Sequence, residues 1–75
     1  MQATQTTLDE YVREFEREYR QMVKHPAFEF YGGKASADNK QRYVARRLFE
    51  IRKQLTPYLH RPECLALAEM IDERL

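Results

Sequence analysis

The sequence predicts a small all-α protein with three helices, at about residues 7–25, 38–55 and 62–75, and with an aromatic and Gly-Gly loop between the first two. Two observations support this fold class. Apolar residues recur at three- and four-residue spacing in three separate stretches, as they do on one face of an α-helix. A proline stands at the end or the start of each stretch, where it stops or begins a helix.

The chain length limits the architecture to one domain. Of the 75 residues, 43% are hydrophobic and 33% are charged, so we expect residues 1–75 to form a single helical domain near the lower size limit for an independent core. With only two Gly and three Pro, the composition also argues against disorder.

The first helix is expected to begin at Thr7. Thr7 and Glu10 have the spacing of a capping box, in which the hydroxyl accepts from the third amide and the carboxylate reaches back to the cap amide. Pro26 ends the helix, because a residue that precedes proline disfavours the α region. The apolar positions of this helix lie in an arc of about 120° and predict one buried face. They are Leu8, Tyr11, Val12, Phe15, Tyr19, Met22 and Val23.

The connection between the first two helices contains a short alternating stretch. Phe28–Tyr31 alternates like a strand, and Gly32-Gly33 permits the positive φ angle of a turn. Because no second strand follows, we expect an ordered loop whose aromatic side chains cap one end of the core.

The second helix has two candidate starts. Asp38 and Gln41 form another capping-box pair, and Ser36 is the alternative N-cap. The Thr56-Pro57 pair ends the helix. Its expected buried stripe, with Tyr43 at one edge, is Val44, Leu48, Ile51 and Leu55.

The third helix is expected to begin at Pro62, since proline suits the first helical position. Leu65 and Met70 lie off its apolar stripe, so this helix has apolar side chains on a second side. We expect residues 58–60, before the helix, to form a buried elbow. The inward stripe is Cys64, Leu67, Ala68, Ile71 and Leu75.

The overall charge and the single cysteine argue against several classes of protein. Thirteen basic against twelve acidic residues leave a formal charge of +1, so no global field directs the chain to nucleic acid or to an acidic membrane. One cysteine cannot form an internal disulfide, which indicates a reducing compartment, and we expect the cytoplasm. Because we find no secretory segment and no apolar run of about 18 residues, we expect no membrane span.

Basic residues are concentrated in the second predicted helix. Residues 39–53 hold six basic and one acidic side chain, whereas the segments before and after them are each net acidic. On a helical wheel, three of the cations lie opposite the buried stripe, with an aromatic residue among them. These four residues are Arg42, Arg46, Phe49 and Lys53. The cations that flank the stripe instead are Lys40, Arg47 and Arg52.

Two interpretations of this basic face stay open. In the first, the cations form a solvated face that is neutralised by the acidic first and third helices, and Phe49 is tucked under the loop or against a neighbouring helix. In the second, the face is a contact patch, because an apolar anchor ringed by arginines suits an acidic protein surface or a phosphate backbone.

Metal, catalytic and base-reading functions find little support in the sequence. His25, His60 and Cys64 are too loosely spaced for a closed zinc set. A helix-turn-helix would place its DNA contacts at the start of the third helix, which begins Pro62-Glu63 and lies in an acidic segment. We therefore expect a protein that is not an enzyme, with no catalytic residues, no metal and no cofactor.

The sequence thus predicts a non-enzymatic interaction protein, an adaptor or inhibitor that docks on the acidic surface of a larger protein through its second helix. The alternative is a nucleic-acid-binding protein that uses the same helix on phosphates. A homodimer also stays open, because a small core fits stabilisation by a second subunit. The predicted partner-binding residues are Arg42, Arg46, Phe49 and Lys53, with Phe30 and Tyr31 of the loop.

Overall fold

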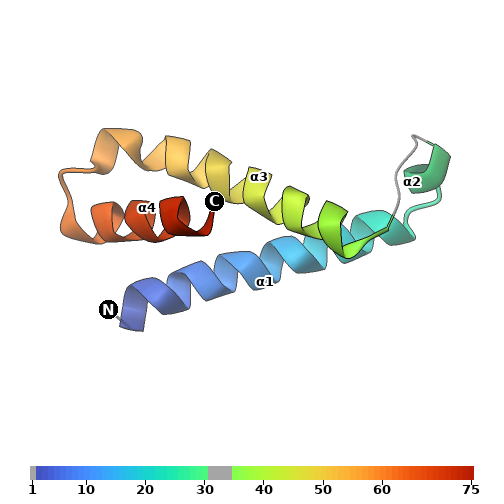
Figure 1. Ribbon diagram of the computed structural model, residues 1–75, viewed down its shortest axis with the longest axis horizontal. Helices are drawn as coiled ribbons and strands as arrows, with labels where there is room; N and C mark the ends of the chain where they lie inside the picture. The colour runs from blue at the N-terminus through green and yellow to red at the C-terminus, as the bar shows by residue number, and fades with distance from the viewer. Residues whose placement is uncertain (1, 31–34) are drawn as a thin grey trace.

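The computed structural model describes residues 2–30 and 35–75, and within these ranges every regular element is a helix (Figure 1). Three helices, α1, α3 and α4, pack on one another and confirm the predicted all-α, three-helix class. The elements in chain order are α1 (Gln2–Lys24), α2 (Ala27–Phe30), α3 (Ala37–Leu55), the 3₁₀ turn η1 (Thr56–Tyr58) and α4 (Pro62–Arg74).

The predicted start of the first helix was wrong. Helix α1 begins at Gln2, so Thr7 lies inside the helix and is not its cap. No glycine or proline in the first seven residues prevents the helix from extending toward the N-terminus. The side-chain amide of Gln5 also donates to the Asp9 carboxylate at 2.9 Å, an (i, i+4) contact that supports the added turn.

Of the two candidate N-caps of the second long helix, Ser36 is the one used. Its hydroxyl oxygen accepts from the Asn39 backbone N–H at 3.0 Å, in the extended backbone conformation typical of an N-cap. Asp38 contributes a negative charge to the first turn, where the helix dipole favours it.

The loop expected at Phe28–Phe30 is a single helical turn, α2. A strand needs a neighbour to satisfy its backbone groups, and the described residues supply none, whereas a helical turn satisfies them locally. The Phe28 N–H donates to the His25 carbonyl at 3.0 Å. The Gly-Gly part of the predicted loop lies outside the described residues.

The elbow before α4 was expected to be buried, and most of it is exposed. Tyr58 is 47% exposed and His60 is exposed, while Leu59 is half-buried. Pro57 lies in the 3₁₀ turn that follows α3, and this turn leaves the Tyr58 ring at the surface. There the Arg61 guanidinium lies 5.4 Å from the ring centre.

The core lies where all three long helices meet. Leu48 and Ile71 are fully buried, and side chains from α1, α3 and α4 surround them. This confirms the centre of each predicted stripe. The buried cluster consists of Leu8, Phe15, Val44, Leu48, Leu67 and Ile71.

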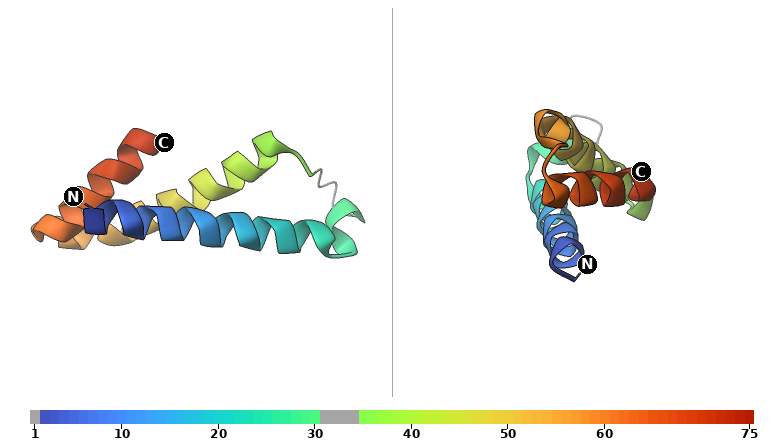
Figure 2. Two further views of the ribbon diagram at one scale, coloured as in Figure 1. Left: turned by 90° about the horizontal axis from the view of Figure 1, so that it is seen from below. Right: turned by 90° about the vertical axis from the view of Figure 1, so that its left-hand side faces the viewer.

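The third helix covers only part of the other two. At 1.5 Å per residue, α1 is about 34 Å long and α4 about 20 Å. Helix α4 lies beside the N-terminal half of α1, and α2 lies at the opposite end (Figures 1 and 2). Met22, which was expected to be buried, is therefore 42% exposed. Leu75 was also expected to be buried, but it follows the last residue of α4 and is 53% exposed.

The molecule is accordingly elongated. It measures 44 × 23 × 17 Å, and its radius of gyration is 14.2 Å, against about 11 Å for a compact chain of this length. Its accessible surface is 5842 Å², against about 4,900 Å² for a compact monomer of 9.1 kDa. The protein thus offers more surface for contact than its mass requires.

Candidate functional site

Arg42, Arg46, Phe49 and Lys53 lie together on the side of α3 that faces away from the core, and we call these four residues the outer face. Val44 and Leu48 are buried on the opposite side of the same helix. All four outer-face residues are exposed, Phe49 by 52%. The Phe49 ring is therefore not tucked against a neighbouring helix.

The cations of α3 fall into two groups. Those that flank the core stripe are all paired with carboxylates of the described residues. Lys40 lies 3.5 Å from Glu16, Arg47 lies 3.5 Å from Glu18 and 3.0 Å from Glu50, and Arg52 lies 3.0 Å from Asp72. The three outer-face cations have no ion-pair partner among the side chains that the structure describes.

Two outer-face cations lie over aromatic rings instead. The Lys53 ammonium is 5.6 Å from the centre of the Phe49 ring, and the Arg46 guanidinium is 5.7 Å from that of Tyr43. A cation over a ring face is attracted by about 0.5–1 kcal/mol at exposed sites. Both side chains remain exposed, so their charges are accessible to a partner.

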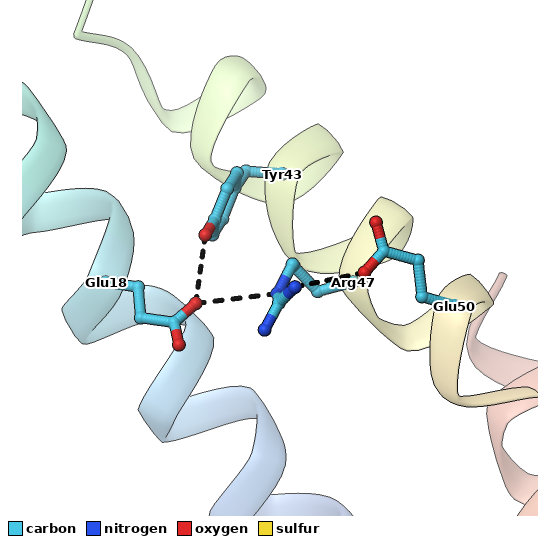
Figure 3. A network of polar contacts seen from close by, with 4 residues as sticks. All are labelled: Glu18, Tyr43, Arg47 and Glu50. Atoms are coloured by element: carbon cyan, nitrogen blue, oxygen red, sulfur yellow. Dashed lines mark hydrogen bonds and ion pairs between the residues drawn. The ribbon is translucent and has the colours of Figure 1, made fainter. Parts of the chain in front are cut away.

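A polar network holds α3 against α1 (Figure 3). The Tyr43 hydroxyl donates to the Glu18 carboxylate at 2.9 Å, and the same oxygen lies 3.5 Å from Nε of Arg47. The Arg47 guanidinium also covers the Phe15 ring at 4.9 Å. Partly exposed ion pairs contribute about 0–1 kcal/mol each, so the network mainly fixes the rotation of α3 about its axis. That rotation points the outer face to solvent.

Burial raises the pKa of Tyr43, and the hydrogen bond to Glu18 and the charge of that carboxylate raise it further. The phenol has a higher pKa in the folded chain than in the unfolded chain, where it is near 10. The protonated phenol of Tyr43 therefore stabilises the folded chain fully below about pH 10, and this stabilisation is lost as the pH rises through the folded-state pKa.

We expect Tyr43→Phe to lower the free energy of unfolding by about 1 kcal/mol at neutral pH, because it removes a hydrogen bond to a carboxylate. This difference from the wild type should shrink at high pH, where the wild-type phenol loses its proton. Urea unfolding of both proteins at about pH 8 and about pH 11 tests this. A difference that is constant across this range would contradict the assignment.

The two loop residues in the predicted site are not tested by the structure. Phe30 is the last residue of α2, and its side chain is outside the described part of the molecule. Tyr31 lies outside the described residues altogether. Neither is placed with the outer face.

Sequence reasoning missed an apolar groove beside the outer face. Met22 and Phe28 line it together with Tyr43, which was placed only at the edge of the core stripe. The signal for it was the difference in helix lengths, since a third helix of 13 residues cannot cover the far end of a first helix of 23.

Of the two histidines, His25 makes a local contact in the turn after α1. His25 Nδ1 accepts from the Ala27 N–H at 3.1 Å, at the break between α1 and α2. Among the described residues, no group of three or more His, Cys, Asp or Glu is arranged to hold a metal ion. Nor is any described helix both long enough and apolar enough to cross a membrane.

No protein-family model, curated protein or solved structure matches this chain. Its function must therefore be inferred from the chemistry of its own surface. The outer face of α3 brings an exposed aromatic ring together with three cations that have no ion-pair partner among the described side chains.

Proposed function

We propose that this protein is a non-enzymatic interaction protein, an adaptor or inhibitor, that docks on a larger protein through the outer face of α3. One observation carries the proposal. The helix pairs its flanking cations with carboxylates of the described residues and leaves those of the outer face without such partners, around a Phe that is 52% exposed.

The two kinds of side chain have different roles in docking. Phe49 is the anchor, because a large ring that moves from water into a pocket of the partner supplies most of the binding energy of a small interface. Arg42, Arg46 and Lys53 steer the approach and pair with carboxylates around that pocket. The partner is thus an acidic protein surface with an apolar depression.

An acidic protein suits this face better than a phosphate backbone does. Glu50 lies next to the anchor and is exposed, and the chain as a whole carries only +1. Phosphates require several cations and no apolar anchor. Nucleic acid is therefore the alternative partner, and binding to it would contradict the proposal.

The proposal is tested by photo-cross-linking. The photoreactive p-benzoylphenylalanine, introduced in place of Phe49, should form a discrete adduct with one protein in a cell extract. Excess wild-type chain should suppress this adduct, whereas the Phe49→Ala variant, which lacks the anchor, should not.

The matched control carries the same photoreactive residue in place of Tyr58, another exposed aromatic residue, which is 47% exposed on η1. It should not give the adduct. Equal adducts from both positions, or no adduct from position 49, would overturn the proposal.

We expect no binding of a labelled DNA duplex or single strand at micromolar protein concentration in moderate salt, as measured by fluorescence anisotropy. If the three outer-face cations each neutralised one phosphate, the affinity would fall with a log–log salt slope of about −3. Micromolar binding with such a slope, lost in Arg42→Ala/Arg46→Ala, would favour the nucleic-acid function instead.

A further inference from the structure

A groove opens at the end of the molecule that α4 does not reach, between the last turns of α1, helix α2 and the first half of α3. Its larger part has a volume of about 740 Å³ and is mainly apolar. A second hollow of about 340 Å³ adjoins it and shares Met22, Phe28 and Tyr43 with it. We call the two together the corner groove.

Both hollows are lined by polar as well as apolar side chains. The larger part is lined by Glu18, Gln21, Met22, His25, Ala27, Phe28 and Tyr43. The smaller part is lined by Tyr19, Met22, Phe28, Asn39, Arg42, Tyr43 and Arg46. Two arginines of the outer face thus belong to the corner groove as well, so the two surfaces are continuous.

The aromatic walls of the groove are held in place before anything binds. Tyr19 is buried, meets Phe28 edge-to-face at 6.2 Å and lies 5.8 Å from the Tyr43 ring. The hydroxyl of Tyr43 is fixed by Glu18. Met22, with its flexible and polarisable thioether, is 42% exposed and can adapt to an inserted side chain. Rigid walls reduce the entropy lost on binding.

The charges at the rim indicate what the groove accepts. Glu18 is already engaged by Tyr43 and Arg47, and His25 Nδ1 accepts from the Ala27 N–H. In contrast, Arg42 and Arg46 have no carboxylate partner in the part of the chain that the structure describes. The rim charge that remains for a ligand is therefore positive, beside an apolar floor.

We infer that the corner groove binds a segment of the partner protein in which a large apolar side chain is flanked by carboxylates. The apolar side chain lies among Met22, Phe28 and Tyr43, and the carboxylates pair with Arg42 and Arg46. This inference rests on the proposed function and extends it. The partner then contacts two anchor points, Phe49 on the outer face and the corner groove, linked by the same two arginines.

The test uses a phage-displayed library of random dodecapeptides, selected on the folded wild-type protein. Selected peptides should share a large apolar residue with Asp or Glu close to it in sequence. A synthetic, labelled member of the set is then titrated with each variant, and circular dichroism confirms that each variant is folded.

The expected losses are specific to the groove. Met22→Gln and, separately, Arg42→Glu/Arg46→Glu should each weaken peptide binding about tenfold or more. The matched controls are Leu65→Gln, which alters a side chain of nearly the same exposure (41%) on α4, and Arg13→Glu/Arg17→Glu on α1. These should leave the affinity within about twofold.

Several results would overturn the inference. Selected peptides that are basic or lack an apolar residue would do so, as would unchanged binding to Met22→Gln. If Met22→Gln instead converted a dimer to a monomer in sedimentation, the occupant would be a second copy of this chain. If Arg42→Glu/Arg46→Glu bound as tightly as the wild type, the groove would be purely apolar and the proposed partner chemistry wrong.

The peptide experiment and the cross-linking experiment can reject the groove and the Phe49 anchor separately. An adduct from position 49 together with unchanged peptide binding by Met22→Gln would reject the groove and keep the docking function. Groove-dependent peptide binding without an adduct from position 49 would reject Phe49 as the anchor and keep the groove.

Discussion

Replacement of Leu48 by Ala is expected to lower the free energy of unfolding by about 2–5 kcal/mol, the largest loss of stability among the changes considered. Leu48 has no exposed surface and lies in the cluster where α1, α3 and α4 meet. A chain of 75 residues has a total stability of only about 4–11 kcal/mol, so the variant should be largely unfolded in mild urea. Urea titration followed by far-ultraviolet circular dichroism measures this loss.

The neighbouring residue provides the control for this prediction. Phe49→Ala removes a larger side chain from the same helix turn, but on the exposed side, and should change the free energy of unfolding by no more than about 0.5 kcal/mol. A Leu48→Ala variant as stable as Phe49→Ala would mean that the rotation of α3 described above is wrong.

Phe49→Ala is expected to weaken binding to the partner captured from position 49 by at least about tenfold, equivalent to about 1.4 kcal/mol. Truncation of an anchor residue commonly costs about 2–4 kcal/mol, because the partner's pocket is left unfilled. Titration calorimetry with the purified partner measures the change. Since Phe49 is exposed, the loss should occur without a change in stability.

Two comparisons make this prediction specific. Leu65→Ala removes an apolar side chain of similar exposure on α4 and should leave the affinity unchanged. Arg46→Ala should have a smaller effect than Phe49→Ala and act mainly on the association rate, with a clear dependence on salt. A larger effect of Arg46→Ala would point to a charged polymer as the partner.

The helices were predictable because their signals are local. Pro62 begins α4 as expected, and the periodic apolar residues of α3 identify Val44 and Leu48 as buried. The error at Thr7 has the opposite cause. A Thr and a Glu three residues apart mark a helix start only when the preceding residues leave the helix, and Gln2–Thr6 continue it.

The outer face was predictable because it lies on a single helix. The corner groove was not predictable because three segments of the chain form it. Which residues of α3 point away from the core depends on the period of that helix alone. The exposure of Met22 depends instead on where α4 ends in space, and the shape of the groove depends on α2, which was expected to be a loop. Features built from three segments of the chain require their relative positions.

The short α4 divides the molecule into a three-helix end and a two-helix end, and the two ends should differ in how often they open. Backbone amides near Leu48 and Ile71 exchange with solvent only when the whole core unfolds, whereas those near Met22 and Lys40 are covered by fewer helices and should open locally at lower cost. The outer face and the corner groove extend toward this two-helix end. A partner that clamps α1, α2 and α3 together would slow amide exchange there and so extend the cooperative unit along the full length of α1.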